Sequence, residues 1–187
     1  MKKLIALSLI PVLSGCLSAS SPKVSQWLLE YNGPVCMTRL TKYDVGRVSQ
    51  VQVRSPYNEV GLAVLRADGS MAFDPYNEYA ANPAAMLKGV AFDAMDASGL
   101  FGTVVNSSSS VKAQSMAEVL VTRLALDCRK EGERKAVASL RVRIIADDGK
   151  ALYAQGDGEA DAKDGNYGAA LSSAISSAFD SAFGRFR

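Results

Sequence analysis

The chain has 187 residues, with 21 lysines and arginines against 19 aspartates and glutamates, and it contains no histidine. The absence of histidine excludes a Ser-His-Asp or Cys-His catalytic arrangement and disfavours zinc and copper sites, for which imidazole is a common ligand. The near balance of charge argues against a nucleic-acid-binding protein, which needs a basic surface to neutralise phosphates. We therefore expect a protein that is not an enzyme, holds no metal or cofactor and has no nucleic-acid partner.

The N-terminus has the pattern of a bacterial lipoprotein signal. Two lysines precede an apolar run over residues 4–13, which is too short to cross a bilayer that needs about 20 residues. The run ends in Leu13-Ser14-Gly15-Cys16, a lipobox, in which a signal peptidase cuts before the cysteine and acyl chains are attached to it. The alternative is an ordinary hydrophobic strand with a chance cysteine. The pattern predicts lipid attachment at Cys16.

This signal divides the chain into a signal peptide over residues 1–15, a lipidated tether over residues 16–23 and one domain over residues 24–187. Without the signal peptide, 172 residues remain, enough for one domain with its own core, and the 19 acidic residues are matched by 19 basic ones. Leu17 follows the cysteine, where the enterobacterial sorting pattern that it resembles favours the outer membrane. We expect a lipid-anchored protein of the cell envelope that faces the periplasm from the outer membrane.

Two further cysteines, Cys36 and Cys128, lie in the domain. In an oxidising periplasm two cysteines of one domain are expected to pair. The alternative is two buried thiols that pack as small hydrophobic groups. The compartment favours a disulfide between them.

The first half of the domain is predicted to form strands followed by a helix. The Asp68-Gly69 pair is typical of a tight hairpin turn, and the strands are expected over residues 24–31, 45–54, 60–66 and 71–73. Asn82 and Pro83 have the pattern of a helix N-cap and first turn, and Gly99 ends the helix. One face of this helix is apolar and is formed by Met86, Leu87, Val90, Ala94 and Ala97, whereas Lys88, Phe92, Met95 and Asp96 lie on the other.

The second half is predicted to form four more strands and a final helix. The strands are expected over residues 100–105, 117–128, 136–146 and 151–160, the last three as a meander. In the strand over residues 136–146, Arg141 and Arg143 are expected on the outer face. The third-to-last strand places Leu120, Leu124, Leu126 and Cys128 on one face. The final helix follows Asn166, with Leu171, Ile175 and Phe179 on an apolar face and Ser172, Ser173, Ser176, Ser177 and Asp180 on the opposite face. The order predicts an α+β fold, an antiparallel or mixed sheet with two main helices packed on one face.

Two motifs that could carry chemistry fail on inspection. Ser109 and Lys112 have the S-x-x-K spacing of penicillin-binding enzymes, but the companion motifs are missing and the serine lies in a loop. The acidic run before the last helix lacks the glycine and glutamate positions of a calcium loop and is interpreted as solvated; it comprises Asp157, Glu159, Asp161 and Asp164.

Several segments together resemble the auxiliary lipoproteins of ABC-type transport systems, the PqiC-like family. The segments lie over residues 27–29, 48–53, 56–57, 61–66, 79–87, 98–101 and 117–127, and in the terminal helix. Tyr79 stands where members usually have tryptophan, and the Cys36/Cys128 pair is not expected of the family. The resemblance implies an accessory component of an MCE-type system that moves phospholipid or other hydrophobic molecules across the envelope, with an MCE protein, a permease and an ATPase as partners.

The sequence thus supports a non-enzymatic, membrane-anchored docking protein, for which exposed aromatic residues would supply the partner contacts. Tyr57, Tyr76 and Phe92 are the candidates. For Phe92 the alternative is a packing contact with a neighbouring loop. A structural or assembly lipoprotein of another envelope complex, for secretion or outer-membrane biogenesis, shares the same features and stays open. A periplasmic enzyme is disfavoured by the missing histidine.

Overall fold

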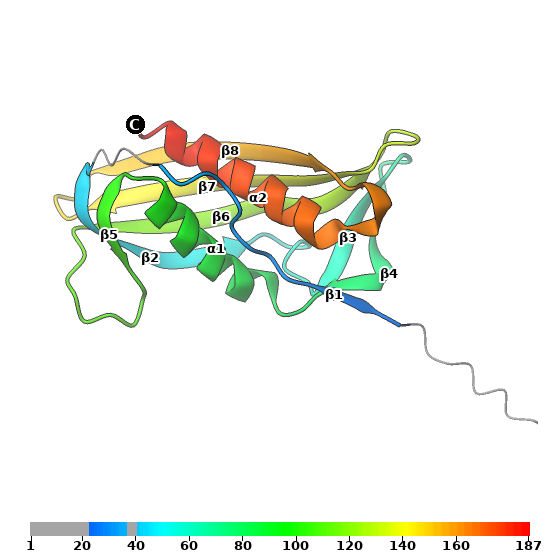
Figure 1. The fold of residues 1–187 in the computed structure, drawn as a ribbon, viewed down its shortest axis with the longest axis horizontal. Coiled ribbons are helices and arrows are strands. Elements are labelled where there is room, and N and C mark those ends of the chain that lie inside the picture. Colours follow the sequence, from blue (N-terminus) through cyan, green and yellow to red (C-terminus); the bar gives the residue numbers. More distant parts are fainter. Residues whose placement is uncertain (1–22, 37–40) are drawn as a thin grey trace, which may run out of the picture.

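The computed structural model describes residues 23–36 and 41–187. The predicted signal peptide, Cys16 and the tether up to residue 22 lie outside the described residues. The elements, in chain order, are β1 (Ser25–Trp27), β2 (Tyr43–Val53), β3 (Gly61–Arg66), β4 (Met71–Tyr79), α1 (Pro83–Ala97), β5 (Phe101–Val105), β6 (Ser115–Cys128), β7 (Lys135–Ala146), β8 (Ala151–Asp161), the 3₁₀ helix η1 (Lys163–Gly165) and α2 (Tyr167–Gly184). One mixed sheet with both helices on one side confirms the predicted α+β class (Figure 1).

The long strand β6 is the centre of this sheet. Along one edge it pairs antiparallel with β7, which pairs antiparallel with β8, so the predicted meander is confirmed. The other edge of β6 is shared by two parallel strands, β2 beside its first half and β3 beside its last three residues. The sheet then continues from β2 to β5 and from β3 through β4 to β1. β6 therefore joins two branches of the sheet, one at each of its ends.

A bulge in β6 changes which of its side chains face the helices. The register with β7 shifts between Val121 and Arg123, and such an extra residue moves the following side chains to the opposite face. Leu124 and Leu126 are buried with the helices, whereas Leu120 lies on the uncovered face. The prediction that Leu120 shares a face with Leu124 and Leu126 is therefore wrong, because strict alternation does not continue through the bulge.

Helix α2 packs on β8 and β7 at very short range. A Cβ on Gly156 would overlap the carbonyl oxygen of Ala178, and one on Gly158 would overlap that of Ala174. The two glycines of β8 and the alanines of α2 therefore bring backbone against backbone. Leu171, Ile175 and Phe179 fill the core beside this contact, as the helical periodicity predicts.

Helix α1 packs on β2 and β5. Its N-terminus is capped as predicted, since the side chain of Asn82 accepts a hydrogen bond from the Ala84 amide at 3.0 Å. Met95 is fully buried, which corrects its assignment to the outer face of the helix. The reason is that its methyl group fits over Gly46 of β2, where a larger residue would collide with it. Among the residues described, neither helix is long and apolar enough to span a membrane.

Residues 28–36, which we call the strap, lie along α2 (Figure 1). The predicted first strand ends at Trp27, and beyond it the strap bonds to serine side chains. Ser172 accepts a hydrogen bond from the backbone amide of Glu30 at 3.1 Å, and Ser176 accepts one from the backbone amide of Asn32 at 2.9 Å. Both serines are buried. The serine face of α2 was expected to lie opposite the packed face, yet it binds the strap, because serine hydroxyls can replace a paired strand as acceptors for backbone amides.

Candidate functional site

The face of the sheet opposite the helices carries a groove of about 580 Å³. Strands β2, β6, β7 and β8 form its floor, and the end of α2 contributes one residue at its rim. The side chains that give it its chemistry are Gln50, Gln52, Glu118, Leu120, Arg141, Arg143, Tyr153, Gln155 and Arg185. Amides, guanidinium groups and a phenol thus surround one leucine.

Strand register sets these side chains in two rows across the sheet. In the first row Glu118 lies between Gln50 and Arg143, and Arg143 is opposite Tyr153. In the second row Leu120 lies between Gln52 and Arg141, and Arg141 is opposite Gln155. Because paired residues in a ladder point to the same face, both rows project from the uncovered side of the sheet.

The first row is held together by charge-assisted hydrogen bonds. The guanidinium of Arg143 donates two hydrogen bonds to one carboxylate oxygen of Glu118, the one from Nε at 2.8 Å. The pKa of Arg143 is raised by its hydrogen bonds with Tyr153 and with Glu118. Arg143 is therefore fixed in position, and its carboxylate partner neutralises it locally.

The second row leaves positive charge available. The lining contains three arginines and one glutamate, and Glu118 is bonded to Arg143. Arg141 is exposed. Arg185, at the rim, lies near Asp157. The pKa of Asp157 is lowered first by a hydrogen bond with Ser139, then by one with Gln155, and less by the charges of Arg123 and Arg185. The arginines therefore give the groove an excess of hydrogen-bond donors, and the glutamine amides add groups that both donate and accept, which suits a ligand or protein surface rich in carboxylates, phosphates or carbonyls.

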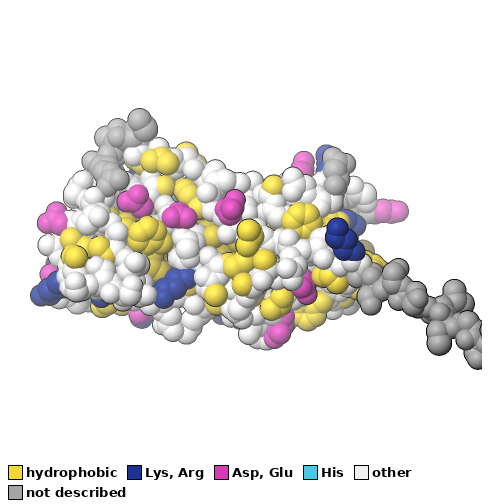
Figure 2. All heavy atoms as spheres, turned by 60° about the horizontal axis from the view of Figure 1, so that its bottom comes forward, with side chains coloured by type: hydrophobic (Ala, Val, Ile, Leu, Met, Phe, Trp, Pro, Cys, Tyr) yellow, Lys and Arg dark blue, Asp and Glu magenta, His cyan; other side chains and the backbone are white. Residues whose placement is uncertain are grey.

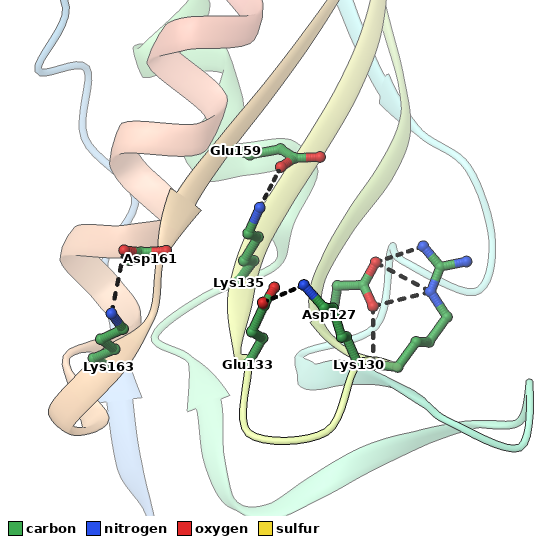
Figure 3. Close-up of polar contacts among 8 residues, drawn as sticks. Asp127, Lys130, Glu133, Lys135, Glu159, Asp161 and Lys163 are labelled. Atoms are coloured by element: carbon green, nitrogen blue, oxygen red, sulfur yellow. Dashed lines mark hydrogen bonds and ion pairs between the residues drawn. The ribbon is translucent and has the colours of Figure 1, made fainter.

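A second group of charged side chains surrounds the turn between β6 and β7 (Figure 3). Lys135 bonds to Glu159 at 3.1 Å, Lys130 to Glu133 at 2.5 Å and Lys163 to Asp161 at 3.7 Å. Figure 2 likewise shows basic and acidic side chains interspersed over another face of the molecule, without a continuous patch of either sign. Exposed ion pairs of this kind contribute little to stability, so this group is a solvated surface.

The acidic run that the sequence places before the last helix is mostly a strand. Asp157, Glu159 and Asp161 belong to β8, which ends at Asp161. Their alternation directs them to the uncovered face, where Glu159 meets Lys135. Asp157 and Glu159 thus lie in the strand predicted over residues 151–160, which extends one residue further to Asp161, and the three carboxylates are exposed. Within the described part of the chain, no group of three or more acidic or cysteine side chains could hold a metal ion.

The aromatic residues proposed as partner contacts are not brought together. Tyr57 lies between β2 and β3 and is half-buried against the core. Phe92 of α1 is also half-buried against the core, which agrees with the alternative of a packing contact. Tyr76 on β4 is 54% exposed. Of the three, Tyr76 presents its ring to solvent most fully.

The structure does not join Cys36 to Cys128. The amide of Cys36 bonds to the Ala97 carbonyl at the end of α1, near the start of β2. Cys128 is the last residue of β6, whose 14 residues span roughly 40 Å. Since β2 and β6 start at the same end of the sheet, the two cysteines lie at opposite ends of the domain. The predicted disulfide is therefore not formed.

Sequence reasoning had found parts of the groove without assembling it. The alternation in β7 predicted Arg141 and Arg143 on its outer face, which is confirmed. The pairing of β2 with β6 is parallel and joins segments more than sixty residues apart, so no local pattern could have placed Gln50 and Gln52 beside them. A parallel pair needs a crossover and leaves no turn signal in the sequence.

Comparisons with known proteins show a shared fold. No family model and no curated protein sequence matches the chain. The crystal structure of protein XCC0632 from Xanthomonas campestris, described as belonging to the DUF330 family, is similar with a TM-score of 0.72 at 11% identity, over 87% of this chain and 94% of that one. A protein described only as uncharacterized has a TM-score of 0.60 at 14% identity, over 85% and 96% of the two chains. PelC from Paraburkholderia phytofirmans, solved as a dodecamer, gives a TM-score of 0.43 at 16% identity, over 79% and 92%.

Proposed function

We propose that this protein is a lipid-anchored, non-enzymatic accessory subunit of an ABC/MCE-type transport system that moves phospholipid or another hydrophobic molecule across the envelope. The observation that carries the proposal is the donor-rich groove on the open face of the sheet. Its side chains can bind and orient a partner, and they include no nucleophile beside a general base. Binding is thus the chemistry that this face supports.

The lipobox and the position of the first strand support the same function. Cys16 precedes the described chain by seven residues, which reach at most about 25 Å when extended. An acylated cysteine would therefore hold the domain close to a membrane while leaving the open face available. The resemblance to the auxiliary lipoproteins supplies the partner class, an MCE protein together with its permease and ATPase.

The groove is the proposed docking surface, and its occupant is a carboxylate- or carbonyl-rich surface of the MCE protein. Arg141 and Arg185 are the groove arginines that are not bonded to Glu118, so they are the residues we expect to contact acidic partner groups. Oppositely charged surfaces raise the association rate and fix the register of docking.

Affinity purification of the tagged, lipidated protein from its own membranes tests the proposal. The wild type is expected to recover an MCE protein and transport subunits, and the double variant Arg141→Glu/Arg185→Glu to lose them. Lys130→Glu, at a highly exposed position in the β6–β7 turn, is the matched control for a reversed surface charge and should retain them. Reproducible recovery of a secretion or outer-membrane assembly complex in place of transport subunits would establish the alternative class of envelope lipoprotein.

A further inference from the structure

The strand pair β1–β4 lies at the end of the domain where the described chain begins (Figure 1), and large apolar or aromatic side chains in and beside it are exposed. Ser25 is in register with Asn77 and Gln26 with Glu78, and Val24 and Tyr76 directly precede this first pair along their two chains. Val24 is 42% exposed, Leu28 61% and Tyr76 54%. These three residues, which we call the β1 patch, are large apolar or amphipathic side chains in contact with solvent.

The β1 patch occupies the outer face of the strand pair. The side chains of Gln26 and Glu78 bond to each other at 2.8 Å, which places these two paired residues on one face of the strand pair. Trp27 and Tyr79 point the other way, into or against the core. Val24 and Leu28 directly flank β1, each two residues from Gln26, so continued alternation places them on the same outer face. Tyr76 precedes Glu78 by two residues in β4, and none of the three patch residues fills the core.

This surface is also the part of the domain nearest to the predicted lipid. Val24 directly follows the tether over residues 16–23, and β1 begins nine residues after Cys16, so acyl chains on Cys16 would lie within about 30 Å of the strand. Anchoring turns further contact with the bilayer into an intramolecular event with a high effective concentration. Under that condition a patch too small to bind a membrane by itself is sufficient to hold the domain against one.

The residue types fit a bilayer surface better than a protein pocket. Tyrosine is enriched at the membrane–water interface, where its ring is apolar and its hydroxyl reaches water. Leucine and valine gain free energy when they leave water for the acyl region. Lys23, exposed next to Val24, adds attraction to anionic headgroups.

We propose that the β1 patch rests on the membrane to which Cys16 is anchored and sets the orientation of the domain. The inference rests on the proposed lipid attachment. β3, β4 and β1 lie beside the C-terminal end of β6, whereas the groove residue Glu118 belongs to its N-terminal half. With the β1 patch on the bilayer, the groove is held away from the membrane, where a periplasmic partner reaches it.

Fluorescence of Trp27 provides the test, since it is the only tryptophan of the chain and lies within β1. The full-length lipidated protein is reconstituted in phosphatidylethanolamine/phosphatidylglycerol vesicles with brominated acyl chains, which quench a tryptophan near the bilayer. Quenching is expected for the wild type and for the control Met116→Glu, an exposed residue at the start of β6. Quenching should be lost in the double variant Val24→Glu/Leu28→Glu. The milder variant Tyr76→Ser, in which quenching should be reduced, replaces the double variant if that protein does not fold.

Two outcomes overturn the proposal. One is an anchored wild-type protein whose Trp27 is not quenched; the other is quenching that is equal in the wild type and in folded variants of the β1 patch. If Trp27 of the wild type is not quenched and the variants of the β1 patch no longer recover the partner in affinity purification, the β1 patch binds a protein and not the membrane. Failure of the lipid anchor itself is recognised separately, because the Cys16 peptide would then lack the mass of acyl chains and the protein would not float with the vesicles.

Discussion

Gly156 of β8 lies so close to Ala178 of α2 that a Cβ on the glycine would overlap the alanine's carbonyl oxygen. Helix and sheet are thus in backbone contact, and no rotamer change can make room for a side chain. Ala178 directly precedes the fully buried Phe179 in α2, so the contact fixes the separation of this part of α2 from the sheet.

Replacing Gly156 by alanine is expected to destabilise the protein by about 1–3 kcal/mol or more, because the helix must move away from β8. Urea unfolding measures the loss. Gly89→Ala is the matched control: Gly89 is exposed within α1 and has open space around its Cα, so the change should stabilise the helix by roughly 0.5–1 kcal/mol. Equal stabilities for the Gly156 variant and the wild type would show that α2 does not pack on β8 as described.

Because of the bulge in β6, we expect alanine to lower the free energy of unfolding by different amounts at Leu126 and Leu120, two leucines that strict alternation would place on one face. Leu126 is 1% exposed and lies in the core on the side of the sheet that the helices cover. Leu126→Ala should therefore lower the free energy of unfolding by about 2–5 kcal/mol. Leu120 lies in the groove on the other face, and Leu120→Ala should cost about 1 kcal/mol or less. Thermal or urea unfolding of the two variants checks the difference. Similar large costs at both positions would mean that β6 runs without the bulge.

The bulge also shows why some features could be predicted from the sequence and others could not. The Asn82 cap and the Asp68-Gly69 turn depend on a few neighbouring residues, and both are confirmed. The bulge depends on how β6 pairs with β7, and the groove depends on β2 lying parallel to β6. These are non-local pairings, so residue patterns predicted the strands but left their order in the sheet and the site open.

The strap was missed for a related reason. Its amides bond to serine hydroxyls, and a serine-rich helix face ordinarily indicates exposure to solvent. Only the burial of Ser172 and Ser176 beneath the strap distinguishes a serine face that binds a segment of the chain from one that is exposed to solvent. These hydroxyls hold the strap in direct contact with α2.

We expect Ser176→Ala to loosen the strap, because it leaves the Asn32 amide without its acceptor at 2.9 Å. A buried amide left without an acceptor costs about 1–3 kcal/mol, and because Asn32 itself is exposed the loss of stability should lie at or below the lower end of this range. Hydrogen exchange of the Asn32 amide should become faster, with a smaller effect on amides of β6. Ser177→Ala, at an exposed position one residue further along the helix, is the control and should leave the exchange unchanged. Unaltered exchange in both variants would contradict the bond to Ser176.

The strap is held at a second point by an ionisable pair. The hydroxyl of Tyr31 donates a hydrogen bond to Asp180 of α2 at 2.6 Å. Burial raises the pKa of Asp180, and this effect outweighs the hydrogen bond from Tyr31 and the charge of Arg187, which both lower it. The pKa of Tyr31 is raised as well, first by burial and then by its bond to Asp180.

A raised carboxyl pKa in the folded state means that the folded protein binds this proton more tightly than the unfolded chain. The stability contributed by Asp180 is therefore fully present below the unfolded pKa of about 4 and is lost as the pH rises through the folded pKa. Asp180→Asn keeps an oxygen acceptor for Tyr31 and cannot titrate. The stability of the wild type relative to this variant should increase as the pH falls from 7 toward 4, measured by urea unfolding at a series of pH values. A difference that stays constant, or that changes in the opposite direction, would show that burial does not govern the titration of Asp180.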